Sequence, residues 1–200
     1  MKKIIMFAVL ALLAPMTYAE ANAAKGKDLA GTCLACHGEV GNSPAPSFPN
    51  LAGQHASYLL KQLIEIQNGK REVLTMTGIL DNLSESDLSD LAAYYAGQPR
   101  NQGSAKEDLV ELGEAIYRAG IPRKDIAACT ACHSPTGNGN GPAVFPALAG
   151  QWPEYIVAQL KNFQTGVRHN DGDSKMMRTT AMDMNEKEMT AVASYLYGLK

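Results

Sequence analysis

The pattern Cys-x-x-Cys-His occurs twice in the chain and uses all four of its cysteines. The first copy spans Cys33–His37, and the second spans Cys129–His133, 96 residues further on. Within each copy the two thiols lie about one helical turn apart, and an imidazole follows directly. Both copies must therefore fold as short turns that present two sulfur atoms and one nitrogen atom to the same bound group.

This pattern is the attachment signature of c-type haem. The two thiols add to the vinyl groups of the porphyrin, and the histidine binds the iron from the proximal side. Three other interpretations are a zinc site with four thiolates, a disulfide within each pair, and a redox-active dithiol. None of them explains why a histidine follows each cysteine pair. The sequence therefore predicts two covalent haems, held by Cys33, Cys36, His37, Cys129, Cys132 and His133.

The two patterns belong to a longer internal repeat. A shift of 97 residues places Phe-Pro-x-Leu-Ala-Gly-Gln at 48–54 on the same pattern at 145–151. We predict two related domains, residues 20–100 and 101–200, joined by a polar, turn-rich linker at about 97–106. The same shift also aligns Tyr58 with Tyr155, Gln62 with Gln159, Leu63 with Leu160 and Gly69 with Gly166.

Helical periodicity dominates both halves, and strand signals are almost absent. Apolar residues recur on one face of 54–68, and helices are also expected at about 24–32 and 109–119. Ser84 and Asn185 each precede an acidic residue by three positions, which is typical of a capping box at a helix N-terminus. The prediction is an all-α fold, in which each small domain wraps around one haem that fills its thin core.

The first residues have the pattern of a secretory signal peptide. Two lysines follow Met1, an apolar run of about eleven residues extends to Ala14, and small residues surround Ala19. This run is shorter than the ~20 residues that span a bilayer. We expect residues 1–19 to be removed, with cleavage after Ala19 or as late as Ala23, and the mature protein to reach the periplasm. A retained membrane anchor is the alternative.

The second axial ligand of each iron is expected to be a methionine sulfur, which suits electron transfer. Met76 is the single methionine in residues 20–100, and it lies eight positions before the cap of the last helix in its half. Met177 lies eight positions before the equivalent cap, and the adjacent Met176 is its main rival. The remaining histidines do not match between the halves and are expected at the surface: His55 and His169.

The chain resembles the di-haem cytochrome c4 family over nearly all of its mature length. The resemblance rests on the tandem haem patterns, the Phe-Pro-x-Leu-Ala-Gly-Gln segments, Met76–Gly78 and an insertion at Asn170–Asp173. It implies two class I cytochrome c folds related by a pseudo-twofold axis, with haem propionates near their interface and His/Met ligation of each iron. It also implies that the carbonyl oxygens of Pro49 and Pro146 accept hydrogen bonds from the proximal imidazoles.

The resemblance further implies a periplasmic carrier that passes electrons from a quinol-oxidising complex towards a terminal oxidase, often of the cbb3 type. No nucleophile–base pair or phosphate-binding loop stands out, so we expect an electron-transfer protein and not an enzyme. A di-haem peroxidase-like enzyme and a haem-based gas-binding module are the alternatives. The net charge of −2 and the lack of a basic block argue against nucleic acid as a partner. The mature chain is not expected to span a membrane, and peripheral association through a partner stays open.

Overall fold

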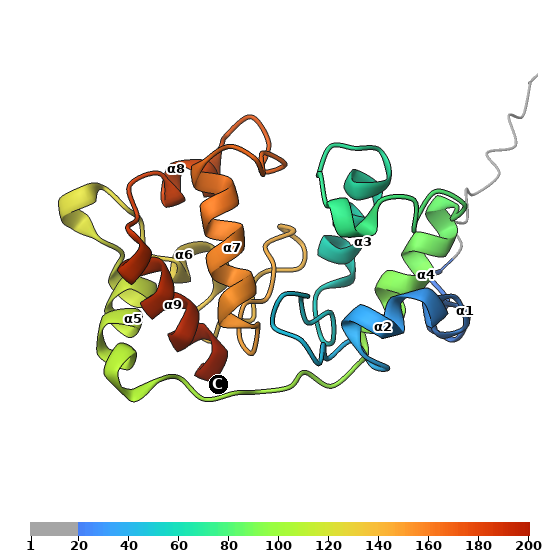
Figure 1. Ribbon diagram of the computed structural model, residues 1–200, viewed down its shortest axis with the longest axis horizontal. Coiled ribbons are helices and arrows are strands. Elements are labelled where there is room, and N and C mark those ends of the chain that lie inside the picture. Colours follow the sequence, from blue (N-terminus) through green and yellow to red (C-terminus); the bar gives the residue numbers. More distant parts are fainter. Residues whose placement is uncertain (1–19) are drawn as a thin grey trace, which may run out of the picture.

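The computed structural model describes residues 20–200. The predicted signal peptide, residues 1–19, lies outside the described residues. Within the described part of the chain, the regular structure is helical apart from two isolated β-bridges, Ile121–Ile126 and Asn140–Phe145. Two helical halves lie side by side along the longest axis of the molecule, joined by an extended segment around residues 97–106 (Figure 1). The all-α fold class is therefore confirmed.

The helices of the first half form a small frame around the first Cys-x-x-Cys-His turn. Helix α2 is that turn, and it ends at the histidine of the motif. Helices α1 and α3 both pack against the last helix, α4. The bounds are α1 Ala23–Leu29, η1 Ala30–Cys33, α2 Leu34–His37, α3 Ala56–Gln67, η2 Leu74–Met76 and α4 Glu85–Ala96, where η denotes a 3-10 helix.

The second half repeats this plan. Helices α5 and α7 pack against α9 in the way that α1 and α3 pack against α4, and α6 takes the place of α2. Helix α8 replaces the short turn η2 in front of the last helix. The bounds are α5 Glu107–Ala119, η3 Pro122–Lys124, α6 Thr130–His133, α7 Pro153–Gln164, α8 Met176–Ala181 and α9 Glu186–Gly198.

The last helix of each half begins at a capping box, as predicted. The Ser84 hydroxyl accepts from the backbone N–H of Asp87, and the Asp87 carboxylate accepts from the N–H of Ser84 at 2.9 Å. Asn185 and Glu188 make the same reciprocal pair at the start of α9. Each box satisfies two backbone donors that the helix itself leaves unpaired. The caps fix where α4 and α9 begin, and thus how much chain is left for the methionine segment before them.

The first and last helices of each half cross in close contact because glycines lie at the crossings. A Cβ on Gly26 of α1 would collide with the carbonyl group of Asp90 in α4. A Cβ on Gly113 of α5 would likewise collide with the carbonyl group of Ala191 in α9. These two glycines are therefore equivalent positions, and they align the first helices of the two halves.

The second half contains an additional segment that the sequence repeat did not reveal. The glycines at the helix crossings are 87 residues apart, whereas the two haem motifs are 96 apart, so the chain between α5 and α6 is nine residues longer. This segment includes η3, from which Lys124 and Arg123 donate to the carboxylate of Glu188 at 2.7 and 3.1 Å. The extra residues thus fasten the start of α9.

Each half has a hydrophobic core of its own. Among residues 20–200, no helix is both long and apolar enough to cross a membrane. The largest fully buried side chains belong mainly to the last helices, which places both cores along α4 and α9. They are Leu80, Leu88, Leu91, Tyr117, Met189 and Leu196.

A reciprocal set of hydrogen bonds joins the two halves. The backbone N–H of Asn50 donates to the Gln151 side chain at 2.9 Å, and Gln151 donates back to the Asn50 carbonyl at 2.9 Å. In the equivalent exchange, Ala147 donates to the Gln54 side chain at 2.8 Å, and Gln54 donates back at 2.9 Å. All four residues are buried. The 97-residue shift aligns Asn50 with Ala147 and Gln54 with Gln151, so the second exchange is the first one with the two halves interchanged. This pattern is that of a pseudo-twofold axis.

Candidate haem-binding cavity

The two motif histidines are buried and held in one orientation by the loops that follow them. His37 Nδ1 lies 3.0 Å from the carbonyl oxygen of Pro49, and His133 Nδ1 lies 2.9 Å from that of Pro146. A carbonyl oxygen only accepts hydrogen bonds, so each Nδ1 carries the proton and each Nε2 keeps its lone pair. Burial lowers the pKa of both imidazoles, and the proline carbonyls oppose this only in part. Both rings are therefore neutral and suited to bind a metal through Nε2.

The four cysteines are free thiols, so neither motif contains a disulfide. All four are partly buried and line a cavity together with the motif histidines. Burial raises the pKa of the Cys129 thiol to about 11. The two cysteine pairs lie in separate halves, and within residues 20–200 no group of three His, Cys, Asp or Glu side chains could hold a metal ion. The arrangement is therefore not a four-thiolate zinc site.

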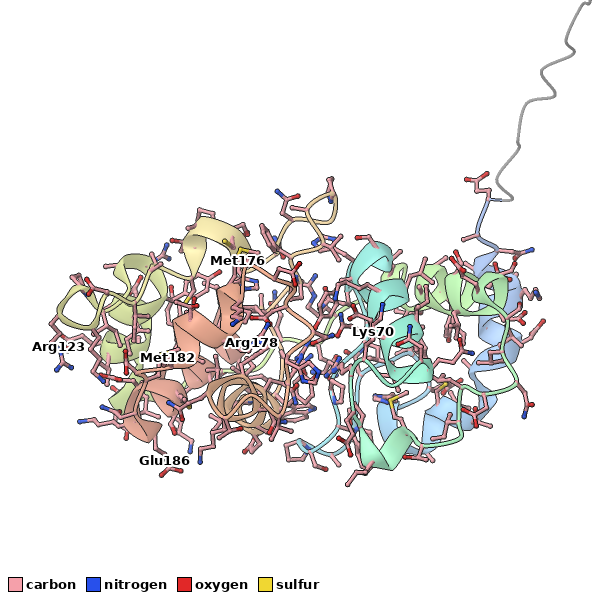
Figure 2. The ribbon with its side chains drawn as sticks, turned by 90° about the horizontal axis from the view of Figure 1, so that it is seen from above. Lys70, Arg123, Met176, Arg178, Met182 and Glu186 are labelled. Atoms are coloured by element: carbon pink, nitrogen blue, oxygen red, sulfur yellow. The ribbon has the colours of Figure 1, made fainter. Side chains whose placement is uncertain are left out.

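The two methionines that are predicted as ligands both lie on the cavity wall, but in different kinds of helix. Met76 ends the short helix η2, and Met177 lies in the first turn of α8. Both line the cavity, and both are half-buried against the core of their own half. Met176 also lines the cavity but is 44% exposed, and Figure 2 shows it at the surface of the second half. Met184, which is buried and reaches the same cavity, is a second rival that sequence spacing did not favour.

One continuous cavity serves both halves. Its volume of about 1160 Å³ exceeds the roughly 300–1,000 Å³ of ordinary small-molecule pockets. Both haem motifs and both methionine segments line it, and most of the remaining lining is aliphatic. In each half the cavity is therefore lined by two thiols, an imidazole, a thioether and apolar side chains. These are the attachment groups, the iron ligands and the surroundings that a c-type haem requires.

Where the halves meet, the cavity contains a polar cluster of two arginines. Each arginine has equivalent tyrosine and glutamine partners. Arg71 donates to Tyr155 and Gln159 of the other half at 2.9 and 3.2 Å. Arg168 donates to Tyr58 and Gln62 at 2.9 and 3.1 Å. Each arginine also donates to the glutamine of its own half at 2.8 Å. The cluster thus obeys the same pseudo-twofold symmetry as the interface.

The arginines of this cluster are buried, yet neither forms a salt bridge in the part of the chain that the structure describes. Arg168 also lies over the Phe163 ring, 4.5 Å from its centroid. Burial disfavours ionisation of Tyr58, but Arg168 and Arg71 outweigh it and lower the Tyr58 pKa. The nearby Glu65 carboxylate interacts electrostatically with Arg71 but does not pair directly with either guanidinium. The guanidinium groups would therefore accept further carboxylates. Sequence analysis missed the pair, although the 97-residue shift that aligns Tyr58 also aligns Arg71 with Arg168.

The second-half insertion reaches across the interface. The Asn170 side chain donates to Gln62 and Glu65 at 2.9 and 2.6 Å, and Lys61 donates to the Asn170 carbonyl at 2.8 Å. His55, which was expected at the surface, is half-buried at the interface, where Nε2 lies 2.7 Å from the Asn138 carbonyl oxygen. His55 thus stays partly accessible, but it also contacts the other half, which its own half does not reveal because the contact follows from its place after the interface residue Gln54. His169 is exposed, as expected.

Tandem helical domains, each with a buried Cys-x-x-Cys-His turn on a shared apolar cavity, define a di-haem c-type cytochrome. The sequence model named Cytochrome c matches residues 23–97 and 110–200. Cytochrome c4 of Pseudomonas aeruginosa is 48% identical over 200 residues, which is 100% of both chains. The crystal structure of reduced recombinant cytochrome c4 from Pseudomonas stutzeri shares 45% identity at a TM-score of 0.88, over 90% of this chain and 100% of that chain.

This chain belongs to the di-haem cytochrome c4 family. As a member, it is an electron-transfer cytochrome with two covalently bound haem c groups, one in each tandem domain. A more distant relative, the thiosulfate dehydrogenase electron acceptor of Thiomonas intermedia, is 37% identical over 84% of this chain and 78% of its own.

Proposed function

We propose that the protein carries electrons between respiratory proteins in the periplasm, through one haem held by each half of the shared cavity. The observation that supports this most directly is the matched set of donors in the two halves. Each half presents a neutral imidazole fixed by a proline carbonyl, and a thioether from the segment before its capped last helix. In this proposal the residues at the first haem are Cys33, Cys36, His37, Pro49 and Met76, and those at the second are Cys129, Cys132, His133, Pro146 and Met177.

The residues around each haem perform separate tasks. The cysteines fix it covalently, which retains it even though each core is small. The proline carbonyls hold the imidazole rings and increase the electron density at Nε2. The aliphatic walls exclude water, so little solvent has to reorganise when charge changes. When bound, each haem supplies an iron that changes oxidation state by one electron.

The buried arginine pair would hold the carboxylates of the two haems at the domain interface. Arg71 and Arg168 lie on the cavity wall and form no salt bridge among the described residues, and a buried charge is costly until it is paired directly. Guanidinium groups bind carboxylates through two parallel hydrogen bonds. The symmetric pair therefore supports an arrangement in which both haems direct their propionates to the same polar cluster, which gives a short route between the two irons.

The attachment sites are tested by removing one thiol pair at a time. Cys33→Ala/Cys36→Ala should yield a chain with one covalent haem in the second half, and Cys129→Ala/Cys132→Ala should yield the mirror result. Intact mass after export with the haem-attachment machinery counts the haems, and peptide mapping locates them. A first double variant that still carries two covalent haems would refute the assignment at Cys33 and Cys36.

The partners follow from the family and from the names of relatives. We infer that electrons arrive from a quinol-oxidising complex and leave to a terminal oxidase of the cbb3 type. A relative named as the electron acceptor of a thiosulfate dehydrogenase supports the broader view that such chains accept electrons from other proteins. Oxygen uptake by purified cbb3-type oxidase, supplied with the reduced protein, should follow the protein concentration and saturate. No uptake above the rate without the protein would remove this oxidase as the acceptor.

A peroxidase-like role needs an iron face that opens to substrate. The methionines that line the cavity in both halves favour closed, six-coordinate irons, which suit electron transfer. The same argument applies to a gas-binding module. Neither alternative is favoured by a feature of the site.

A further inference from the structure

The two halves place a buried tyrosine near the first cysteine of the haem motif from different helices. The glycine crossings align Ala30 of the first half with Tyr117 of the second. The capping boxes align Tyr95 of α4 with Leu196 of α9. At the first of these two positions the first half has alanine and the second half has tyrosine. At the second position the first half has tyrosine and the second half has leucine.

Each of these tyrosines packs against the matched tyrosine of the last helix in its half. Tyr94 and Tyr195 occupy matched positions, and each packs against a second tyrosine. In the first half that partner is Tyr95, at 5.0 Å between ring centroids, and in the second it is Tyr117, at 5.7 Å. Burial, and then the adjacent motif cysteine, raise the pKa of both Tyr95 and Tyr117. Both hydroxyls are therefore shielded from solvent near the first cysteine of their motif.

The two hydroxyls differ in their hydrogen bonds. Tyr117 is fully buried, and its hydroxyl donates to the backbone carbonyls of Ser134 and His133 at 2.5 and 3.3 Å. Tyr95 is 3% exposed, and among residues 20–200 its hydroxyl has no hydrogen-bond partner of good geometry; its polar neighbour is the Cys33 thiol, a weak partner that haem attachment would convert to a thioether. Tyr95 lines the haem cavity, whereas Tyr117 is not among the residues that line it. An unpaired buried hydroxyl lowers the stability of the folded state, so its retention calls for a reason.

We propose that the Tyr95 hydroxyl is a positioning group that lowers the reduction potential of the first haem and has no counterpart at the second. The proposal rests on haem attachment at Cys33, as proposed above. Oxidation adds one positive charge at the iron, and in a dry cavity that charge is poorly screened. A hydroxyl that makes no well-formed hydrogen bond within residues 20–200 can turn its oxygen towards the added charge. Tyr117 cannot respond in this way, because two carbonyls fix its proton.

Tyr95→Phe removes the hydroxyl and keeps the ring. The variant should raise the potential of the first haem, with a shift of about fivefold in its reduction equilibrium, which is the scale of one hydrogen bond. The reduction potential of the second haem should not change. Tyr94→Phe is the matched control, because its hydroxyl donates to the Glu39 carbonyl at 3.1 Å and Tyr94 is not among the cavity-lining residues. This control should leave both potentials unchanged.

The measurement is a spectroelectrochemical titration of the intact di-haem protein. Proton NMR of haem methyl groups follows each haem separately, assigned through contacts with the cavity residues Leu59 in the first half and Leu160 in the second. Intact mass first counts two haems in every variant, so a failure of attachment is seen as a missing haem and not as a shifted potential. An unmoved first potential in Tyr95→Phe, an equal shift of both haems, or the same shift in Tyr94→Phe would overturn the proposal.

A second variant guards against a packing defect. Ala30→Tyr combined with Tyr95→Leu gives the first half the arrangement that already folds in the second. It should raise the potential of the first haem in the same direction as Tyr95→Phe. A first potential that falls or stays constant in this double variant would contradict a role for the free hydroxyl.

Discussion

Which methionine serves as the second axial ligand of each iron depends on the position of individual side chains. In the first half Met76 is the one methionine among residues 20–100, and the structure places it on the cavity wall. In the second half Met176, Met177 and Met184 all reach the cavity. Met177 is half-buried and packs on the core, whereas Met176 is more exposed and Met184 is deeply buried. A ligand needs packing that holds its side chain and a sulfur atom that is not committed to the core. Met177 meets both conditions, because it packs against the core cluster without belonging to it and lines the cavity.

Replacing Met76 with alanine should open the first iron without loss of haem attachment. Alanine carries no sulfur, so the sixth position becomes free for small ligands. Carbon monoxide should then bind one haem per chain in the reduced variant, as seen by difference spectroscopy, and none in the unmodified protein. Unchanged carbon monoxide reactivity of the first haem would sink the assignment of Met76.

The second-half ligand is resolved by three parallel variants. Met177→Ala should bind carbon monoxide at one haem, whereas Met176→Ala and Met184→Ala should not. Met184→Ala should instead lower the free energy of unfolding by about 2–5 kcal/mol, because it leaves a cavity in the core. Carbon monoxide binding by Met176→Ala alone would transfer the ligand role to Met176.

The N-terminus of helix α9 is held by both a capping box and ion pairs to Glu188. Glu188 is 4% exposed, accepts from the N–H of Asn185 at 2.8 Å, and is clamped by Lys124 and Arg123 from the additional segment. Burial alone would raise the Glu188 pKa, but Lys124 and the Asn185 N–H outweigh it and hold the pKa below its usual value. Glu186, labelled in Figure 2, also lies in the first turn; its side chain is 76% exposed and forms an ion pair with Lys161.

A carboxylate whose pKa is lowered by folding stabilises the folded state above its unfolded pKa. That stabilisation is lost as the pH falls from about 4.3 through the lowered folded pKa. Glu188→Gln should therefore reduce stability near neutral pH and flatten the loss of stability in acid. Thermal melts of the holoprotein between pH 7 and pH 3 measure this.

Glu186→Gln is the control for the acid melts, because Glu186 is exposed and solvent screens its ion pair with Lys161. Its pH dependence should match that of the unmodified protein. An equal flattening in both variants would mean that the clamp on Glu188 does not set the acid stability of α9.

In the molecule as a whole, the sequence predicts local features well. The haem turns, the helix starts at Ser84 and Asn185, and the repeat all depend on short patterns, and the structure shows the capping boxes and the all-α fold. The arginine cluster, the position of His55 and the free hydroxyl of Tyr95 depend on contacts between residues far apart in the chain. No local pattern specifies which half supplies such a partner.

The pseudo-twofold axis explains why one chain holds two similar but unequal haem sites. The reciprocal bonds at Gln54 and Gln151 and the exchange between Arg71 and Arg168 are symmetric, so the cavity is continuous across the interface. The additional segment with η3, the insertion at Asn170 and the exchange of tyrosines are not symmetric. These differences provide a physical basis for two potentials within one molecule.

The central claim is that both irons are low-spin and ligated by histidine and methionine. A visible-spectrum redox titration of the exported protein tests it most directly. The account predicts two low-spin c-type haems that titrate at positive potentials, with the weak sulfur-to-iron band present in the oxidised state. A high-spin component, or one haem at a strongly negative potential, would contradict the account and favour an enzyme or a sensor.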